Sequence, residues 1–251
     1  MKNYLFITIF LSLFIHNSYA QFIENGEIEF EVKTNVKKTM GNSMWAESMK
    51  DKLPTFKTVF YKYTFSNNKS ICQFDRWENK ESLPEFLRQG EEKYVWYTDF
   101  NNASYHLKKE LFGSIFNIKD SIKNIQWKLT NENRIIAGYN CRKAIGIIMD
   151  SIYVFAFYSE EFTIPGGPCT INNLPGMILG MTIPRLYTSW IANKVTIKDS
   201  SIIINEPLET KNMFTSNSAI ITIKEKTKNW MNDDDPESGK WMNQIIWNLI
   251  L

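Results

Sequence analysis

The sequence offers few side chains for nucleophilic or metal chemistry. Its histidines are His16 and His106, and its cysteines are Cys72, Cys141 and Cys169. His16 lies in an N-terminal segment that we expect to be removed, so a metal site built on two or three histidines of one chain is excluded. A Ser-His-Asp or Cys-His arrangement would have to be organised around His106.

The sequence context of His106 argues against such an arrangement. It lies in the alternating run YHLK, in which Tyr105 and Leu107 are expected to face the core and His106 the solvent. Cys169 follows a Gly-Gly-Pro turn and would be the nucleophile of a hydrolase, but it would need His106 as its base. We therefore predict no catalytic residue, no metal ion and no cofactor, and a protein that is not an enzyme.

Two acidic groups have the composition of functional sites but the spacing of structural ones. Glu160 and Glu161 are adjacent, and adjacent residues of an extended segment point to opposite faces, so they cannot share one substrate. Asp233, Asp235 and Glu237 alternate as calcium ligands do, but the glycine that follows them comes one position late for a calcium loop. We interpret this second group as an acidic turn that caps the last helix.

The N-terminal residues have the pattern of a secretory signal. A lysine at position 2 precedes an apolar run over residues 4–15, and the small residues Ser18 and Ala20 follow it. We expect residues 1–20 to be removed, so that residues 21–251 form a single exported domain. In that oxidising compartment the three cysteines, Cys72, Cys141 and Cys169, allow at most one intrachain disulfide, and the sequence does not choose the pair.

The charge balance excludes one class of partner. The chain has 29 Lys and Arg residues against 27 Asp and Glu residues, and loss of Lys2 leaves 28 against 27. Nucleic-acid-binding proteins usually carry a strong basic excess, so we expect no nucleic acid. Because no apolar stretch after the signal is long enough to cross a bilayer, we also expect no transmembrane segment in the mature chain.

Alternation with period two is the strongest pattern, and it is typical of half-buried strands. Ile28, Phe30 and Val32 alternate with glutamates, and short Asn-rich turns at residues 67–68 and 101–102 favour an antiparallel meander. Further strands are expected over residues 59–65, 70–74, 93–98, 103–108, 125–129, 140–149, 152–158, 177–182, 187–197 and 219–223.

Two segments have a helical period instead. Apolar residues recur every four positions over residues 43–53 and stop at Pro54. Near the C-terminus, Asp235 is placed as an N-cap before Pro236, and a wide apolar stripe follows. We predict a mainly β fold: a curved antiparallel sheet, open or half-barrel, with a short N-terminal helix and a C-terminal amphipathic helix packed on it.

The stretch over residues 125–185 carries a family resemblance. Its segments IQWKLTNENRIIAGYNCRKA, AFYSEEFTIPGGP and NLPGMIL resemble, in order and spacing, the GLPGLI family of exported proteins from Gram-negative envelopes. The chain departs from the family pattern at Asn173, Met177, Phe157 and Cys169, where Gly, Leu, Trp and another large residue are usual. The resemblance implies a location in the periplasm or at the periphery of the outer membrane, and it carries over no catalytic residue.

The loop over residues 164–176 combines three prolines with three glycines. It is either a buried corner that shapes the sheet, which we favour, or a recognition loop. Because asparagine tolerates the left-handed region, we expect a positive φ at Asn173 or a side-chain bond to its own turn. The residues of a ligand or partner loop would be Tyr158, Pro165, Gly167, Pro168, Cys169, Asn173, Leu174, Pro175 and Gly176.

Three functions follow from these patterns. The favoured one is a non-enzymatic binding module for an apolar or lipid-like ligand, because a curved sheet covered by a wide apolar helix can enclose such a molecule. The alternative is an accessory subunit of an outer-membrane transport complex, bound through an exposed strand edge. A hydrolase that uses Cys169 or a serine is the least favoured.

Overall fold

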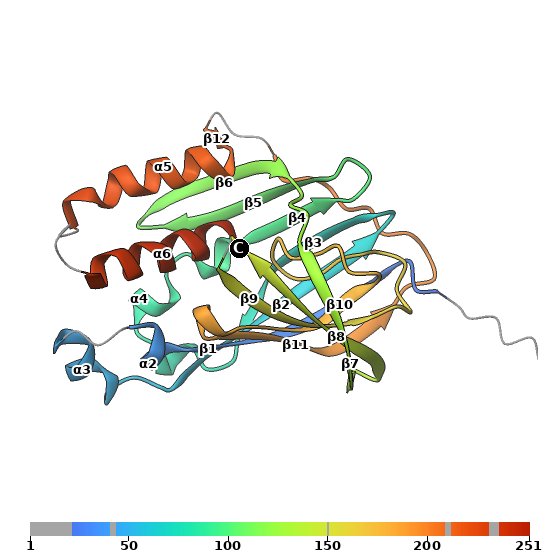
Figure 1. Cartoon of the computed structure of the whole chain (residues 1–251), viewed down its shortest axis with the longest axis horizontal. Coiled ribbons are helices and arrows are strands. Elements are labelled where there is room, and N and C mark those ends of the chain that lie inside the picture. Colours follow the sequence, from blue (N-terminus) through green and yellow to red (C-terminus); the bar gives the residue numbers. More distant parts are fainter. Residues whose placement is uncertain (1–21, 41–43, 150, 209–211, 231–235) are drawn as a thin grey trace, which may run out of the picture.

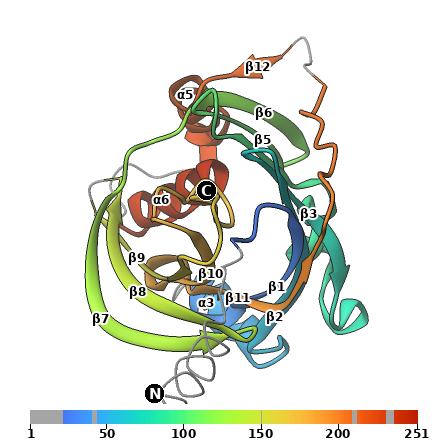
Figure 2. The same cartoon turned by 90° about the vertical axis from the view of Figure 1, so that its right-hand side faces the viewer.

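The computed structural model describes residues 22–40, 44–149, 151–208, 212–230 and 236–251. Within these ranges one curved sheet runs through the molecule, with the strand order β12-β6-β5-β4-β3-β2-β1-β11-β10-β9-β8-β7. Its strands pair antiparallel except for β12, which pairs parallel with β6. The sheet bends into a bowl that does not close, because β12 and β7 remain unpaired with each other (Figures 1 and 2).

The strands are β1 (Gly26–Asn35), β2 (Phe56–Ser66), β3 (Lys69–Trp77), β4 (Val95–Asp99), β5 (Ser104–Leu111), β6 (Ser114–Ser121), β7 (Gln126–Ile136), β8 (Tyr139–Ile148), β9 (Ile152–Ser159), β10 (Met177–Ile183), β11 (Thr188–Ile197) and β12 (Met213–Phe214). The α-helices are α2 (Val36–Thr39), α3 (Met44–Lys50), α4 (Glu85–Arg88), α5 (Ser216–Thr227) and α6 (Pro236–Ile250). Short 3-10 turns are η1 (Lys80–Ser82), η2 (Glu91–Lys93), η3 (Pro184–Leu186) and η4 (Lys228–Trp230).

The architecture confirms the fold class predicted from the sequence. Every predicted strand is present except the one over residues 219–223, and β6 and the two-residue strand β12 are additional strands that the alternation did not reveal. The short N-terminal helix falls within residues 43–53 as α3. The C-terminal helix α6 begins at Pro236 as expected, whereas Asp235, its predicted N-cap, lies outside the described residues.

The strand predicted over residues 219–223 is wrong, because these residues belong to helix α5. The Thr215 side chain accepts a bond from the Ser218 backbone N–H, and the Ser218 side chain accepts one from the Thr215 N–H, which forms a capping box. Ala219, Ile223 and Thr227 then recur every four residues and are all fully buried. Capping and burial at helical spacing therefore outweigh the β propensity of an Ile-Ile-Thr-Ile run.

The concave face of the sheet is apolar and the convex face of its centre is charged. Ile28, Phe30 and Val32 of β1 are buried on the concave side. On the other face of β1, Glu27 pairs with Lys62 at 2.6 Å, and Glu29 pairs with Arg76 at 2.8 Å. Such exposed pairs contribute little stability, so burial on the concave side holds the fold.

Helix α6 lies inside the bowl rather than outside it (Figure 2). Its residues Met242, Ile245 and Leu249 are buried and form a stripe at helical spacing. None of the described helices combines the length and the hydropathy needed to cross a membrane. The stripe packs instead on the concave face of the sheet.

Candidate functional site

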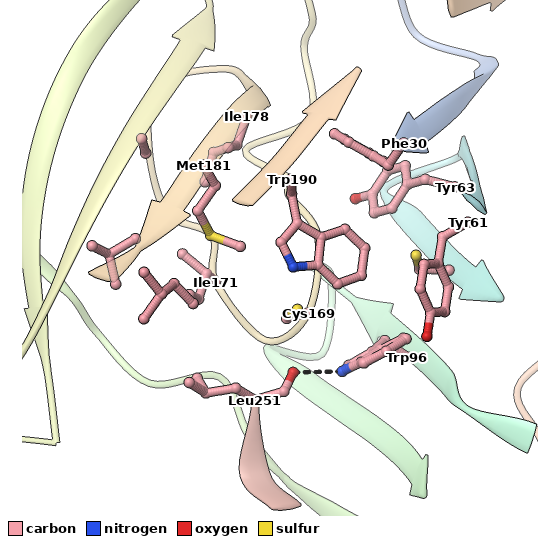
Figure 3. Close-up of a cluster of buried hydrophobic side chains, with 14 of the residues drawn as sticks. Phe30, Tyr61, Tyr63, Trp96, Cys169, Ile171, Ile178, Met181, Trp190 and Leu251 are labelled. Atoms are coloured by element: carbon pink, nitrogen blue, oxygen red, sulfur yellow. Dashed lines mark hydrogen bonds between the residues drawn. The ribbon is translucent and has the colours of Figure 1, made fainter. Parts of the chain in front are cut away.

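The segment between β9 and β10, residues 160–176, turns inward and fills part of the bowl; we call it the plug loop. Its side chains Ile164, Ile171 and Leu174 are buried. Figure 3 shows Cys169 and Ile171 among Trp190 and other residues of the concave face. Most of the predicted recognition loop is therefore part of the core.

The plug loop takes the backbone conformations that its sequence predicts. Asn173 has a φ of 69°, which confirms the expected left-handed conformation. Its side chain donates to the carbonyl of Lys123 at 3.3 Å rather than to its own turn. Gly176 has a φ of 142°, and a Cβ at this position would lie 2.1 Å from the backbone oxygen of Ser159. Only glycine fits there.

Backbone hydrogen bonds fix the two limbs of the plug loop to each other. The Asn173 N–H donates to the Pro165 carbonyl at 3.1 Å, and the Ile178 N–H donates to the Gly166 carbonyl at 2.9 Å. A Cβ on Gly166 would lie 2.5 Å from the buried hydroxyl of Tyr63. These contacts fix the path of the loop backbone.

The three cysteines are all free and buried, so no disulfide joins Cys72, Cys141 and Cys169. Burial raises the pKa of the Cys141 and Cys169 thiols to about 12. The thiolate is the nucleophilic form, and burial holds the Cys169 thiol in its protonated form at neutral pH.

The expected exposure of His106 is wrong, because its side chain is 0% exposed. Tyr105 and Leu107 are buried on the other face of β5, as expected. The segment over residues 198–208 passes along the convex side of the bowl (Figure 2) and brings Glu206 Oε1 to 3.7 Å from His106 Nδ1. Strand β5 is thus covered on both faces. His106 and Cys169 lie on opposite sides of the sheet and cannot form a catalytic pair.

The C-terminal end of α6 is held by donors from the sheet and the plug loop. The last carbonyl groups of a helix have no partner within it. Three side chains donate to these groups: Trp96 Nε1 to Leu251 O at 2.6 Å (Figure 3), Lys109 Nζ to Asn248 O at 2.6 Å, and Thr170 Oγ1 to Ile250 O at 3.2 Å.

Lys109 is a cation inside the bowl, where only 5% of its surface is exposed. Its Nζ lies 4.8 Å from the ring centroid of Trp96 and 5.1 Å from that of Tyr94. Burial lowers the pKa of Lys109 to about 8. The alternation that places Tyr105 and Leu107 inside also places Lys109 inside. The inward position of Lys109 could therefore have been predicted from the period of the sequence.

Glu91 is a carboxylate whose charge acts to raise the pKa of Lys109. It accepts hydrogen bonds from Lys57 Nζ and from the Tyr61 hydroxyl, both at 2.7 Å. Burial acts to raise the pKa of Glu91, but the Lys57 ammonium and these hydrogen bonds outweigh it and leave the pKa below its usual value. The charge of Glu91 is therefore compensated within the fold.

Aromatic rings line the concave face beneath α6 and the plug loop (Figure 3). The Tyr61 ring lies 5.0 Å from Trp190 and 5.4 Å from Trp96, measured between centroids, and the two tryptophans are 5.8 Å apart. We call this lined surface, with Phe30 and Tyr63, the covered face. Residues of the plug loop and α6 pack against it.

A second concavity lies where β7, β8 and β9 end; we call it the rim cleft. Its volume is about 580 Å³, which falls within the range of ligand pockets. Of the residues predicted for a recognition loop, Tyr158 lines it and the others do not. The lining residues are Phe22, Asn133, Asn140, Arg142, Tyr158, Ser159, Glu160 and Glu161.

The sequence analysis did not single out Arg142, Asn133 or Asn140. The register between β7 and β8 brings these three side chains together. The residue types alone do not indicate that register. Among the described residues, no cluster of three or more His, Cys, Asp or Glu side chains is arranged to hold a metal ion.

Comparison with known proteins finds similarity at the level of shape. No protein family matches the chain, and no curated protein matches it. The chain is similar to PNGF-II in two crystal forms, C2 and P21, with 15% sequence identity and TM-scores of 0.45 and 0.46. Each match covers 76% of this chain and 31% of the matched chain, so this chain spans about a third of the PNGF-II length.

Proposed function

We propose that this protein is an exported, non-enzymatic binding protein of the Gram-negative cell envelope, of the GLPGLI type, and that it holds an apolar or lipid-like ligand on the covered face. One observation carries the proposal. The aromatic covered face is closed by helix α6 together with the plug loop, and not by further strands of the sheet. A helix that ends in side-chain hydrogen bonds is a cover that can detach as a unit.

The apolar side chains of α6 occupy the place that an acyl chain would take. Ile245 and Leu249 are buried against the bowl, so detachment of α6 exposes apolar surface at a cost of roughly 25 cal/mol per Å². A bound apolar ligand would cover that surface again. The ligand would therefore offset part of the cost of detaching the helix.

The hydrogen bonds at the end of α6 set how often the bowl opens. When only a fraction of the protein molecules is in the binding-competent state, the apparent affinity for the ligand is reduced by that fraction. Removal of the Thr170 donor should raise the open population because such a bond contributes roughly 0.5–1.5 kcal/mol. Binding should then become tighter, because Thr170 is not among the residues of the covered face.

An apolar fluorescent probe, 1-N-phenylnaphthylamine, tests this proposal. We expect the wild-type protein to bind the probe, and Thr170→Val to bind it about three- to tenfold more tightly. Lys226→Met is the matched control, because it removes a bond of 3.1 Å between α5 and Ser114 and leaves α6 untouched. If neither the probe nor lipid extracted with the protein binds, or if Thr170→Val behaves like the control, the proposal fails.

A partner protein of the outer membrane is a second candidate, and strand β7 favours it. β7 is an end strand of the sheet, and its Ile135 is 72% exposed. A register shift between Leu129 and Asn133 and the charges of Glu132 and Arg134 limit pairing along part of this edge. Ile135→Lys should abolish recovery of a stoichiometric membrane-protein partner if the edge is its binding site, and should leave that recovery unchanged if it is not.

A further inference from the structure

The rim cleft gathers polar side chains from three strands on one face of the sheet. Arg142 of β8 lies directly opposite Asn133 of β7 and Tyr158 of β9. Cross-strand partners project from the same side of a sheet. Asn140 is two residues from Arg142 and therefore shares that side. Glu160 joins the group through a hydrogen bond of 3.2 Å from the Tyr158 hydroxyl.

These side chains are held in place before any ligand arrives. Arg142 Nε donates to the Thr130 carbonyl at 2.7 Å, which fixes the plane of the guanidinium. Tyr158 and Ser159 are buried at the floor. The Ser159 hydroxyl lies 3.4 Å from Glu161 Oε1.

An aromatic ring forms the lip of the cleft. Phe22 is 60% exposed and lines the cleft. The next residue, Ile23, anchors it because its N–H donates to the Glu161 carbonyl at 2.8 Å. The cleft thus has a polar wall and an exposed aromatic face.

The mixture of charges selects the class of ligand. A strongly anionic molecule would meet Glu160 and Glu161, and a strongly cationic one would meet Arg142. A neutral, hydroxyl-rich molecule suits both, because every hydroxyl can donate to a carboxylate or an amide oxygen and accept from a guanidinium or an amide N–H. The Phe22 ring offers an apolar surface to the C–H side of a sugar ring.

We propose that the rim cleft is a binding site for a neutral saccharide. The site differs from the covered face in its chemistry and requires no movement of α6. It therefore does not depend on the apolar ligand proposed above, and either proposal can fail without the other.

Titration with maltotriose, cellotriose and chitotriose, followed by saturation-transfer NMR and calorimetry, tests the site. We expect at least one trisaccharide to bind with a dissociation constant below about 10 mM. Tyr158→Phe, Glu160→Gln and Phe22→Ser should each weaken that binding by roughly three- to tenfold, because each removes one contact. Glu160 and Phe22 are exposed, so their substitution should leave the unfolding curve unchanged.

Phe56→Ser provides the matched control. Phe56 is 53% exposed and does not line the cleft, so this variant should bind saccharide like the wild type. The proposal is overturned if no trisaccharide binds, if the three cleft variants bind as well as Phe56→Ser, or if the zwitterionic dipeptide glycylglycine binds in the cleft and the sugars do not.

Discussion

The covered face and the rim cleft belong to the same sheet but differ in polarity and in accessibility to a ligand. The covered face is aromatic, and the chain's own plug loop and α6 pack against it, so a ligand there must displace protein. The rim cleft is polar and open, and its side chains are already fixed by Thr130 and Glu160. The comparison shows that burial, more than strand pairing, separates a structural surface from an accessible one.

The largest expected effect is the loss of stability caused by a substitution in the plug loop. Gly176→Val should abolish folding or destabilise by more than about 4 kcal/mol, because its Cβ would collide with the backbone oxygen of Ser159. Urea unfolding monitored by tryptophan fluorescence measures the loss. If this variant unfolds like the wild type, the plug loop does not hold the covered face together.

The next effect tests the charge beneath α6. Lys109 has a pKa of about 8 in the folded protein and an ordinary value of 10.5, so the unfolded chain binds more protons between these values. The contribution of Lys109 to stability should therefore increase as pH rises from about 8 to about 10.5, by an amount on the order of 3 kcal/mol, whereas the raised pKa of the buried Cys141 and Cys169 thiols acts in the opposite direction. The Lys109 contribution should be absent in Lys109→Met, whereas the cysteine contribution should be present in both proteins. A pH series of urea unfolding curves for both proteins checks the difference, and parallel curves would contradict it.

A smaller effect separates conformation from recognition at Asn173. Because Asn173 has a positive φ, Asn173→Val should destabilise by about 1 to 2 kcal/mol, whereas Asn173→Gly should be nearly neutral. Thermal unfolding of the two variants measures this. A valine variant that melts like the wild type but loses a ligand or partner would make this residue part of a recognition site.

The smallest effect on stability is expected in the rim cleft. Tyr158→Phe removes a hydroxyl whose bond goes to the exposed Glu160, so we expect a loss of less than about 1 kcal/mol in unfolding free energy. Tyr158→Ala should cost about 3 to 5 kcal/mol, because the ring itself is buried. Similar losses for both variants would show that the hydroxyl, and with it the cleft, is structural.

Local patterns in the sequence predicted most of the fold. The period-two alternation located nearly all strands, and Pro236 marked the start of α6, because both depend on residues that are neighbours in the chain. The left-handed conformation of Asn173 was predictable for the same reason. The segment over residues 219–223 was mistaken for a strand because its capping box begins upstream, at Thr215.

The sequence by itself determined a curved antiparallel sheet, a C-terminal covering helix and a demanding turn between β9 and β10. Only the tertiary structure decided that His106 is buried, that Lys109 holds the end of α6 and that Arg142 joins Tyr158 in a cleft. The first two outcomes depend on contacts between segments remote in the chain, the Glu206 segment over β5 and α6 against β5. The third depends on the register of the β8–β9 hairpin. The period of the sequence determines on which face of the sheet a side chain lies, but its burial depends on which other segments of the chain pack on that face.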